Sequence, residues 1–126
     1  MIYGIGVDIE NIKKFYDFLN KENYIKKIYT KYEINELNKI KNKRRKAEFL
    51  ASRYAAKEAM SKALGVGISN EFSFKDIEVV KNILGKPEVK YKNFNVHISI
   101  SHTKEIVTVF IVVENYNRKG EKIDKW

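Results

Sequence analysis

The stretch AEFLASRYAAKEAMSKAL, residues 47–64, decides the fold of this chain. It is rich in Ala, Leu, Glu and Lys, it contains no Pro or Gly, and it is followed by Gly65. These are good helix formers, and glycine just after them is a common helix stop because it adopts the left-handed conformation without strain. The pattern therefore predicts a long central helix that ends at Leu64.

Shorter patterns flank this helix on both sides. Residues 2–9 alternate as a strand would, apolar residues recur at helical spacing over 12–19, and Thr30 with Glu33 has the capping-box spacing that starts a helix at Lys31. After the helix, strand-like segments cover 76–81, 88–91, 96–101 and 106–113, with a turn signal at 85–87 and a hairpin turn at 102–105. This order predicts an α+β fold with a mainly antiparallel sheet packed against the long helix.

Length and composition limit the classes of protein to which the chain can belong. The chain has 126 residues, which suits one domain over 1–114 followed by a polar tail over 115–126. It contains no cysteine, which excludes disulfides, thiolate nucleophiles and cysteine-ligated zinc. No apolar run is long enough to cross a bilayer, and the start lacks the pattern of a signal peptide, so we expect a cytoplasmic protein without membrane contact. The net charge of +9 favours an anionic partner of unspecified kind.

Several polar residues could carry chemistry, although each has an ordinary structural interpretation. Asp8 falls at a strand end, where turn and cap aspartates are common. Glu58 and Lys62 lie four apart on one helix face, and Arg53 with Lys57 forms a second pair offset around it. The simplest interpretation of such pairs is a solvated helix surface.

The segment Ser101-His102-Thr103 lies at a turn, where it could meet a phosphate or simply decorate a loop. Neighbouring strand residues point to opposite faces, which argues against Ser101 and His102 as a hydrolase pair. His97 and His102 lack further nitrogen or sulfur ligands for zinc. The glycine pairs at 4/6 and 65/67 match neither the dinucleotide fingerprint nor the phosphate loop.

Five blocks occur in order along the chain: GVDI (6–9), FLASRYAAKEA (49–59), KA (62–63), GKP (85–87) and SISHT (99–103). Together they resemble the holo-acyl-carrier-protein synthases over about residues 1–113. The resemblance implies a fold of the 4′-phosphopantetheinyl transferase kind, assembled as homotrimers with active sites between neighbouring subunits. It also implies transfer of 4′-phosphopantetheine from coenzyme A to a serine of an acidic apo-acyl carrier protein, for fatty acid biosynthesis.

The resemblance further assigns roles to residues. Asp8 and Glu58 match the Mg²⁺ ligands, a donor set that suits a hard cation completed by water and phosphate. The carrier serine would attack the β-phosphate and release adenosine 3′,5′-bisphosphate, with Mg²⁺ and Lys62 stabilising the shifting charge as catalytic groups. The base that takes the serine proton stays open between Glu58, Asp8 and a metal-bound water. The implied coenzyme A-binding residues are Arg53, Lys62, Gly65, Gly67, Gly85, Lys86, Pro87, His102 and Thr103.

Basic residues near the first helix, namely Lys13, Lys14 and Lys21, are the implied docking site for the carrier protein. Lys14 stands where relatives commonly have Arg, and Val66 replaces a common Thr. The alternative to an enzyme is a basic module that binds RNA or another polyanion through residues 39–46 and the scattered tyrosines. That basic run has no interleaved aromatics for base stacking, and such a module has no need of Asp8 or Glu58. We therefore expect no nucleic-acid partner.

Overall fold

The structure is a computed structural model that describes residues 1–65, 73–116 and 119–122. Its elements in chain order are β1 (Ile2–Asn11), α1 (Lys14–Phe18), α2 (Glu22–Ile28), α3 (Lys31–Lys39), α4 (Lys43–Leu64), a 3-10 turn η1 (Phe74–Asp76), β2 (Glu78–Lys81), β3 (Pro87–Lys90), β4 (Val96–His102) and β5 (Ile106–Glu114).

The long central helix is α4, and both of its ends have a local cause. The Asn42 side chain accepts a hydrogen bond from the Arg45 amide at 3.0 Å, so the helix begins at Lys43 rather than at the predicted Ala47. At the other end Gly65 has φ +73°, as predicted for a glycine that stops a helix.

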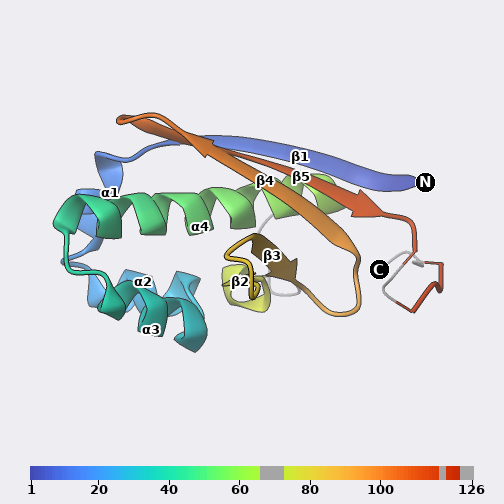
Figure 1. The fold of residues 1–126 in the computed structure, drawn as a ribbon, viewed down its shortest axis with the longest axis horizontal. Coiled ribbons are helices and arrows are strands. Elements are labelled where there is room, and N and C mark those ends of the chain that lie inside the picture. The colour runs from blue at the N-terminus through green and yellow to red at the C-terminus, as the bar shows by residue number, and fades with distance from the viewer. Residues whose placement is uncertain (66–72, 117–118, 123–126) are drawn as a thin grey trace.

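The strands form two antiparallel sheets. One has the order β1-β5-β4, and the other is the β2–β3 hairpin. Figure 1 shows α4 running along one face of the three-stranded sheet, with α2, α3 and the β2–β3 hairpin on the other side of the helix. The predicted α+β class, with an antiparallel sheet packed against a long helix, is confirmed.

The main sheet rests closely on α4. Val107, Val109, Ile111 and Val113 of β5 are buried on the helix side, and the same face of β1 carries Gly4, Gly6 and Asp8. A Cβ at Gly6 would lie 1.8 Å from the Ala59 carbonyl oxygen, and one at Gly4 would lie 1.8 Å from that of Ala63. Only glycine permits this approach, which carries Asp8 onto the helix surface.

The first helical segment is shorter than the predicted 12–19. The Ile12 amide donates to the Glu105 carbonyl at 2.8 Å, so this part of the chain is still tied to the sheet, and α1 has only five residues. The following helix α2 was not predicted. It is anchored where the Tyr29 hydroxyl, just beyond its end, donates to the Leu50 carbonyl of α4 at 2.7 Å.

The helix α3 begins at Lys31 as predicted. The Glu33 amide donates to the Thr30 hydroxyl at 3.2 Å, and the Thr30 amide donates to Glu33 Oε1 at 2.9 Å, which completes the capping box. In the described part of the chain no helix is both long and apolar enough to cross a membrane. Beyond β5, Tyr116 pairs with Lys122 in a single antiparallel bridge.

Candidate active site

Asp8 is held at the surface of α4 by the alternation of β1. Its Oδ1 lies 3.3 Å from the Lys62 ammonium, which also donates to the Val7 carbonyl at 2.9 Å. Its Oδ2 is buried and has no hydrogen-bond partner among the described residues. A buried carboxylate oxygen without a partner is costly, so this atom marks a place where a cationic ligand would be favoured.

Glu58 lies one turn before Lys62 on α4, and Tyr54 lies one turn before Glu58. Burial, together with the carboxylates of Glu58, Glu10 and Asp8, raises the pKa of Tyr54 to about 12. Asp8 and Glu58 therefore both act electrostatically on Tyr54, although fifty residues of sequence separate them.

Glu10 is a third acidic residue of this site that the sequence analysis missed. Burial, together with the nearby Asp8, raises the pKa of Glu10 to about 7, and Lys14 opposes the shift. Its Oε1 lies 3.6 Å from Lys14 Nζ. The available signal was its period-two spacing from Asp8, which places both side chains on the same face of β1.

Asp8 and Glu58 are suitable oxygen ligands for a hard divalent cation, although they are only two. In residues 1–65, 73–116 and 119–122 no three His, Asp, Glu or Cys side chains are grouped so as to hold a metal. Magnesium commonly takes only one or two protein carboxylates and completes its shell with water and substrate phosphate. Asp8, with one unpaired oxygen, and Glu58 could supply those two carboxylates.

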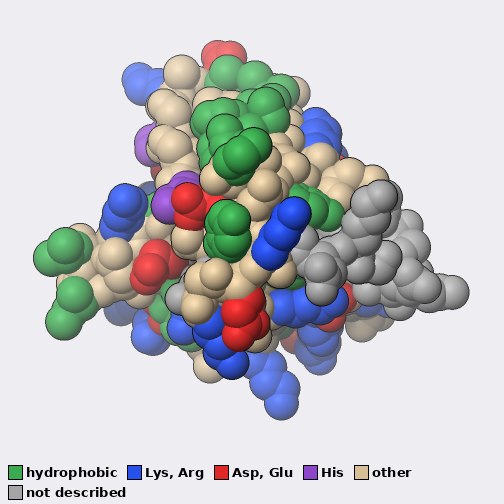
Figure 2. Space-filling model, turned by 90° about the vertical axis from the view of Figure 1, so that its right-hand side faces the viewer, with side chains coloured by type: hydrophobic (Ala, Val, Ile, Leu, Met, Phe, Trp, Pro, Cys, Tyr) green, Lys and Arg blue, Asp and Glu red, His purple; other side chains and the backbone are tan. Residues whose placement is uncertain are grey.

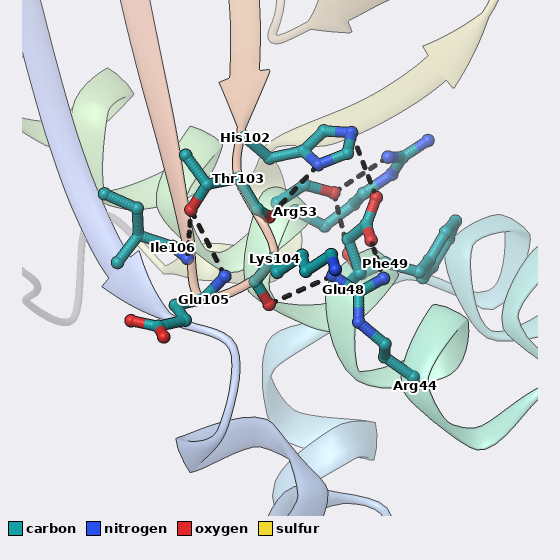
Figure 3. Close-up of polar contacts among 10 residues, drawn as sticks. Arg44, Glu48, Phe49, Arg53, His102, Thr103, Lys104, Glu105 and Ile106 are labelled. Atoms are coloured by element: carbon teal, nitrogen blue, oxygen red, sulfur yellow. Dashed lines mark hydrogen bonds and ion pairs between the residues drawn. The ribbon is translucent and has the colours of Figure 1, made fainter.

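A second polar group gathers around Arg53 and His102 (Figure 3). The Arg53 guanidinium lies 4.2 Å from the Phe49 ring centroid, donates to the Ser52 hydroxyl at 2.9 Å, and leaves its buried Nε without a partner among the described residues. Burial lowers the pKa of Arg53, while Glu33 and more distant groups oppose this shift. The unpaired donor makes this spot favourable for an anion.

His102 is oriented by a carboxylate of α4. Its Nε2 lies 3.2 Å from Glu48 Oε1, and Arg44 binds the other Glu48 oxygen at 3.0 Å. Thr103 lies beside it, where its hydroxyl accepts the amides of Glu105 and Ile106 at 3.2 Å. The adjoining cavity of about 190 Å³ is lined by Arg45, Arg53, Lys81 and His102 among others. Three cations around one small cavity suit a phosphate group.

The two groups lie on different sides of the molecule. Glu58 and Arg53 are five residues apart on α4, which separates them by about 140° around the helix axis. Asp8 lies on β1 and His102 on β4, and these strands form opposite edges of the sheet. One chain therefore presents the predicted metal ligands and the predicted phosphate-binding residues separately.

The remaining predicted coenzyme-binding residues lie elsewhere. Gly65 ends α4, and Gly67 lies outside the described residues. Gly85 is in the β2–β3 turn with φ +81°. Lys86 and Pro87 line a separate cavity of about 250 Å³ that also touches β4. The fold does not bring the three turn residues into the cavity beside Arg53.

The predicted docking lysines differ in their surroundings. Lys13 and Lys14 line a cavity of about 650 Å³ between α1 and the β4–β5 turn. Lys14 Nζ also lies 5.3 Å from the centroid of the Tyr54 ring, so this lysine reaches toward the site of Asp8 and Glu58. Lys21 immediately precedes α2, and its Nζ lies 5.6 Å from the centroid of the Tyr24 ring.

Residues 4–117 match the family model described as the 4′-phosphopantetheinyl transferase superfamily. The chain belongs to this superfamily. This membership confirms the resemblance carried by the five sequence blocks, and it does not favour the polyanion-binding alternative.

Particular phosphopantetheinyl transferases resemble the chain closely. A holo-[acyl-carrier-protein] synthase of Staphylococcus aureus is 43% identical over 115 residues, which cover 90% of this chain and 97% of the relative. The crystal structure of a holo-(acyl-carrier-protein) synthase from Bacillus anthracis, in complex with CoA (3′,5′-ADP), has a TM-score of 0.82 at 43% identity and covers 90% of this chain and 97% of that one.

A more distant relative retains the same fold. The holo-[acyl-carrier-protein] synthase of Helicobacter pylori, in complex with coenzyme A, has a TM-score of 0.76 at 28% identity and covers 87% of this chain and 99% of that one. The predicted enzyme class is therefore confirmed: the chain is a phosphopantetheinyl transferase of the holo-[acyl-carrier-protein] synthase kind.

Proposed function

We propose that the chain transfers the 4′-phosphopantetheine group of coenzyme A to a serine of an apo-acyl carrier protein, with Mg²⁺ as cofactor, and releases adenosine 3′,5′-bisphosphate. The observation that carries the proposal is the Asp8 carboxylate, whose Oδ1 is bound by Lys62 and whose buried Oδ2 is unpaired among the described residues. The coenzyme complexes of the Bacillus anthracis and Helicobacter pylori relatives support coenzyme A as the donor.

Asp8 and Glu58 are the proposed ligands of Mg²⁺. When bound, the ion would supply positive charge to the diphosphate of the coenzyme. The unpaired Asp8 oxygen and the convergence of Asp8 and Glu58 on Tyr54 support this assignment. In this proposal the close contact of β1 with α4 brings together two carboxylates from distant sequence positions.

Lys62 has the reach to act on the same phosphates. Its side chain is 53% exposed, and its ammonium bonds only to the surface groups Asp8 Oδ1 and Val7 O among its described partners. A lysine held this loosely can turn to an incoming phosphate without losing a buried partner. It would stabilise the negative charge that moves to the leaving group.

We further propose a homotrimer in which neighbouring subunits complete each active site. Asp8 and His102 lie on opposite edge strands of one sheet, and Glu58 and Arg53 lie on different faces of α4, so a rotated neighbour could place its Arg53 beside the first subunit's Asp8. A ring is the closed form of such a contact between unlike surfaces.

The outer face of the sheet supports this assembly. Ile5, Val7, Ile9 and Phe110 are each about half exposed there, and Val7 pairs with Phe110 across the strands. Figure 2 shows hydrophobic side chains gathered at the top of the molecule, the side where Figure 1 places the sheet, with Lys and Arg gathered lower down. Apolar patches of this kind commonly mark protein interfaces.

The acceptor in this proposal is an acidic acyl carrier protein of fatty acid biosynthesis, in the cytoplasm. The net charge of +9 and the position of Lys13 and Lys14 beside the cavity at α1 support an acidic partner. Lys21 would extend the same docking surface.

Mass spectrometry tests the proposed transfer directly. Purified chain, coenzyme A, Mg²⁺ and an apo-acyl carrier protein should yield a carrier heavier by one phosphopantetheine group. The carrier with its acceptor serine changed to alanine is the control and should stay unmodified. Absence of the added mass on several carrier proteins would overturn the proposal.

A further inference from the structure

Lys14 belongs to two neighbourhoods at once. It opens α1 and lines the cavity of about 650 Å³ together with Lys13, Tyr16 and Lys104. Its ammonium also lies 3.6 Å from Glu10 Oε1 and 5.3 Å from the centroid of the Tyr54 ring. The side chain therefore connects a surface cavity with the carboxylates around Asp8.

Glu10 links Lys14 electrostatically to the proposed metal ligands. Its side chain is 13% exposed, it lies two residues from Asp8 on the same face of β1, and the charge of Asp8 helps to raise its pKa. Tyr54 lies one turn before Glu58 on α4, and Glu58, Glu10 and Asp8 all raise its pKa. A change in the charge next to Glu10 and Tyr54 therefore changes the electrostatic potential at Asp8 and Glu58 in this partly buried region.

Lys13 is the adjacent lysine, and no described carboxylate lies within ion-pair distance of it. It lines the same cavity as Lys14 and carries the same charge. The two lysines thus offer a matched comparison, because an acidic partner at the cavity meets both while only Lys14 contacts Glu10.

We propose that Lys14 couples carrier docking to metal binding: an acidic carrier that engages the Lys14 ammonium draws it from Glu10, which makes the Asp8–Glu58 site more negative and strengthens its affinity for Mg²⁺. This inference rests on the proposed function. The Lys14–Glu10 contact is suited to the exchange because the lysine side chain is 53% exposed, and ion pairs of that exposure hold weakly.

The sign of the coupling between carrier binding and Mg²⁺ binding follows from the charges. While Lys14 pairs with Glu10, its positive charge opposes the entry of another cation. When the carrier takes Lys14 away, that opposition is lost, so carrier and Mg²⁺ bind cooperatively. Linkage requires the effect to be reciprocal: Mg²⁺ must tighten carrier binding by the same factor.

The test measures carrier binding rather than turnover. The probe is a labelled acidic acyl carrier protein whose acceptor serine is changed to alanine. Fluorescence anisotropy gives its Kd for the chain in the presence of coenzyme A, with and without Mg²⁺. For the unaltered chain we expect Mg²⁺ to lower this Kd about fivefold or more. The Lys13→Met variant should bind the carrier more weakly, yet Mg²⁺ should lower its carrier Kd by the same factor.

Lys14→Met and Glu10→Gln should each lose the Mg²⁺ effect on carrier affinity, and the double variant should resemble either single one. Circular dichroism confirms that each variant is folded. The inference is overturned if Mg²⁺ leaves the carrier Kd of the unaltered chain unchanged. It is also overturned if Mg²⁺ lowers the carrier Kd of Lys14→Met as much as that of the unaltered chain. Failure of the proposed function is a separate result, since it appears as no mass gain on the unsubstituted carrier protein.

Discussion

Lys57 Nζ lies 2.8 Å from Glu33 Oε1, and both side chains are completely shielded from solvent. Lys57 also donates to the Phe74 carbonyl at 2.9 Å and to the Ile77 carbonyl, while Glu33 accepts the Val79 amide at 2.9 Å. The lysine of the AAKEA block is therefore an interior link between α4, α3 and β2, not part of the solvated helix face that its spacing had suggested. Burial lowers the pKa of Lys57, and Glu33 opposes that shift.

Replacing Lys57 should destabilise the fold strongly. Lys57→Met leaves the Glu33 carboxylate buried without its counter-ion, and we expect a loss of about 3–5 kcal/mol in the free energy of unfolding. Urea denaturation followed by circular dichroism measures it. Lys75→Met removes an exposed lysine of η1 and is the control, with little expected change. A loss below about 1 kcal/mol for Lys57→Met would mean that the pair is not important for stability.

Replacing either proposed metal ligand should abolish transfer without unfolding the protein. Asp8→Asn and Glu58→Gln keep the side-chain shape but remove the charge that a divalent cation needs. Mass spectrometry of the carrier at ordinary Mg²⁺ measures the loss, and Glu22→Gln, an exposed carboxylate on α2, should remain active. Full activity in both altered proteins would contradict the assignment.

Much of this arrangement could be read from the sequence, for physical reasons that differ between elements. The end of α4 at Gly65 and the hairpin at 102–105 depend on local signals, a glycine stop and period-two alternation, and both were predicted. Helix α2 has only seven residues, and a helix of that length depends on tertiary contacts such as the Tyr29–Leu50 hydrogen bond.

The sequence indicated some of the contacts in the proposed site and not others. Asp8, Glu58 and Lys62 do come together, because β1 lies on the face of α4 that carries the last two. The separation of Arg53 from Glu58 follows from their helical spacing, whereas that of His102 from Asp8 depends on the strand order β1-β5-β4, which no local pattern reveals. Glu10 gains its importance from burial beside Asp8, and this burial exists only after the strand has packed on the helix.

Two inactive variants should restore activity to each other if neighbouring subunits share the site. Glu58→Gln alters the proposed metal-binding half of the site and Arg53→Ala alters the proposed phosphate-binding half, so a mixed ring contains some sites with both halves intact. Co-expression in equal amounts should give about a quarter of the unaltered activity, because each half is intact in half of the subunits. No recovery in mixed rings isolated by affinity tags on both variants would show that each site lies within one subunit.

Glu10 should make stability depend on pH when divalent cations are absent. Its pKa is raised from 4.5 to about 7 in the folded protein, so between these values the folded state holds a proton that the unfolded state has released. Stability contributed by this group must therefore fall as pH rises through that window. Thermal unfolding of the unaltered chain and of Glu10→Gln across this range measures it.

The difference in Tm between these two proteins should shift in favour of Glu10→Gln as the pH rises. A difference that stays constant across the window would contradict the raised pKa. Addition of Mg²⁺ provides a further check, since a cation near Asp8 favours the ionised carboxyl and should reduce the pH dependence.

The contact of β1 with α4 at Gly4 and Gly6 also bears on ion-size selectivity. Main-chain atoms of the strand and the helix already lie against each other there, so the backbone spacing between the two elements that carry the proposed metal-binding carboxylates cannot shrink. We therefore expect a variant meant to accept Ca²⁺, which needs longer metal–oxygen bonds and more ligands, to require a change in this spacing at residues 4 and 6 as well as in the carboxylates.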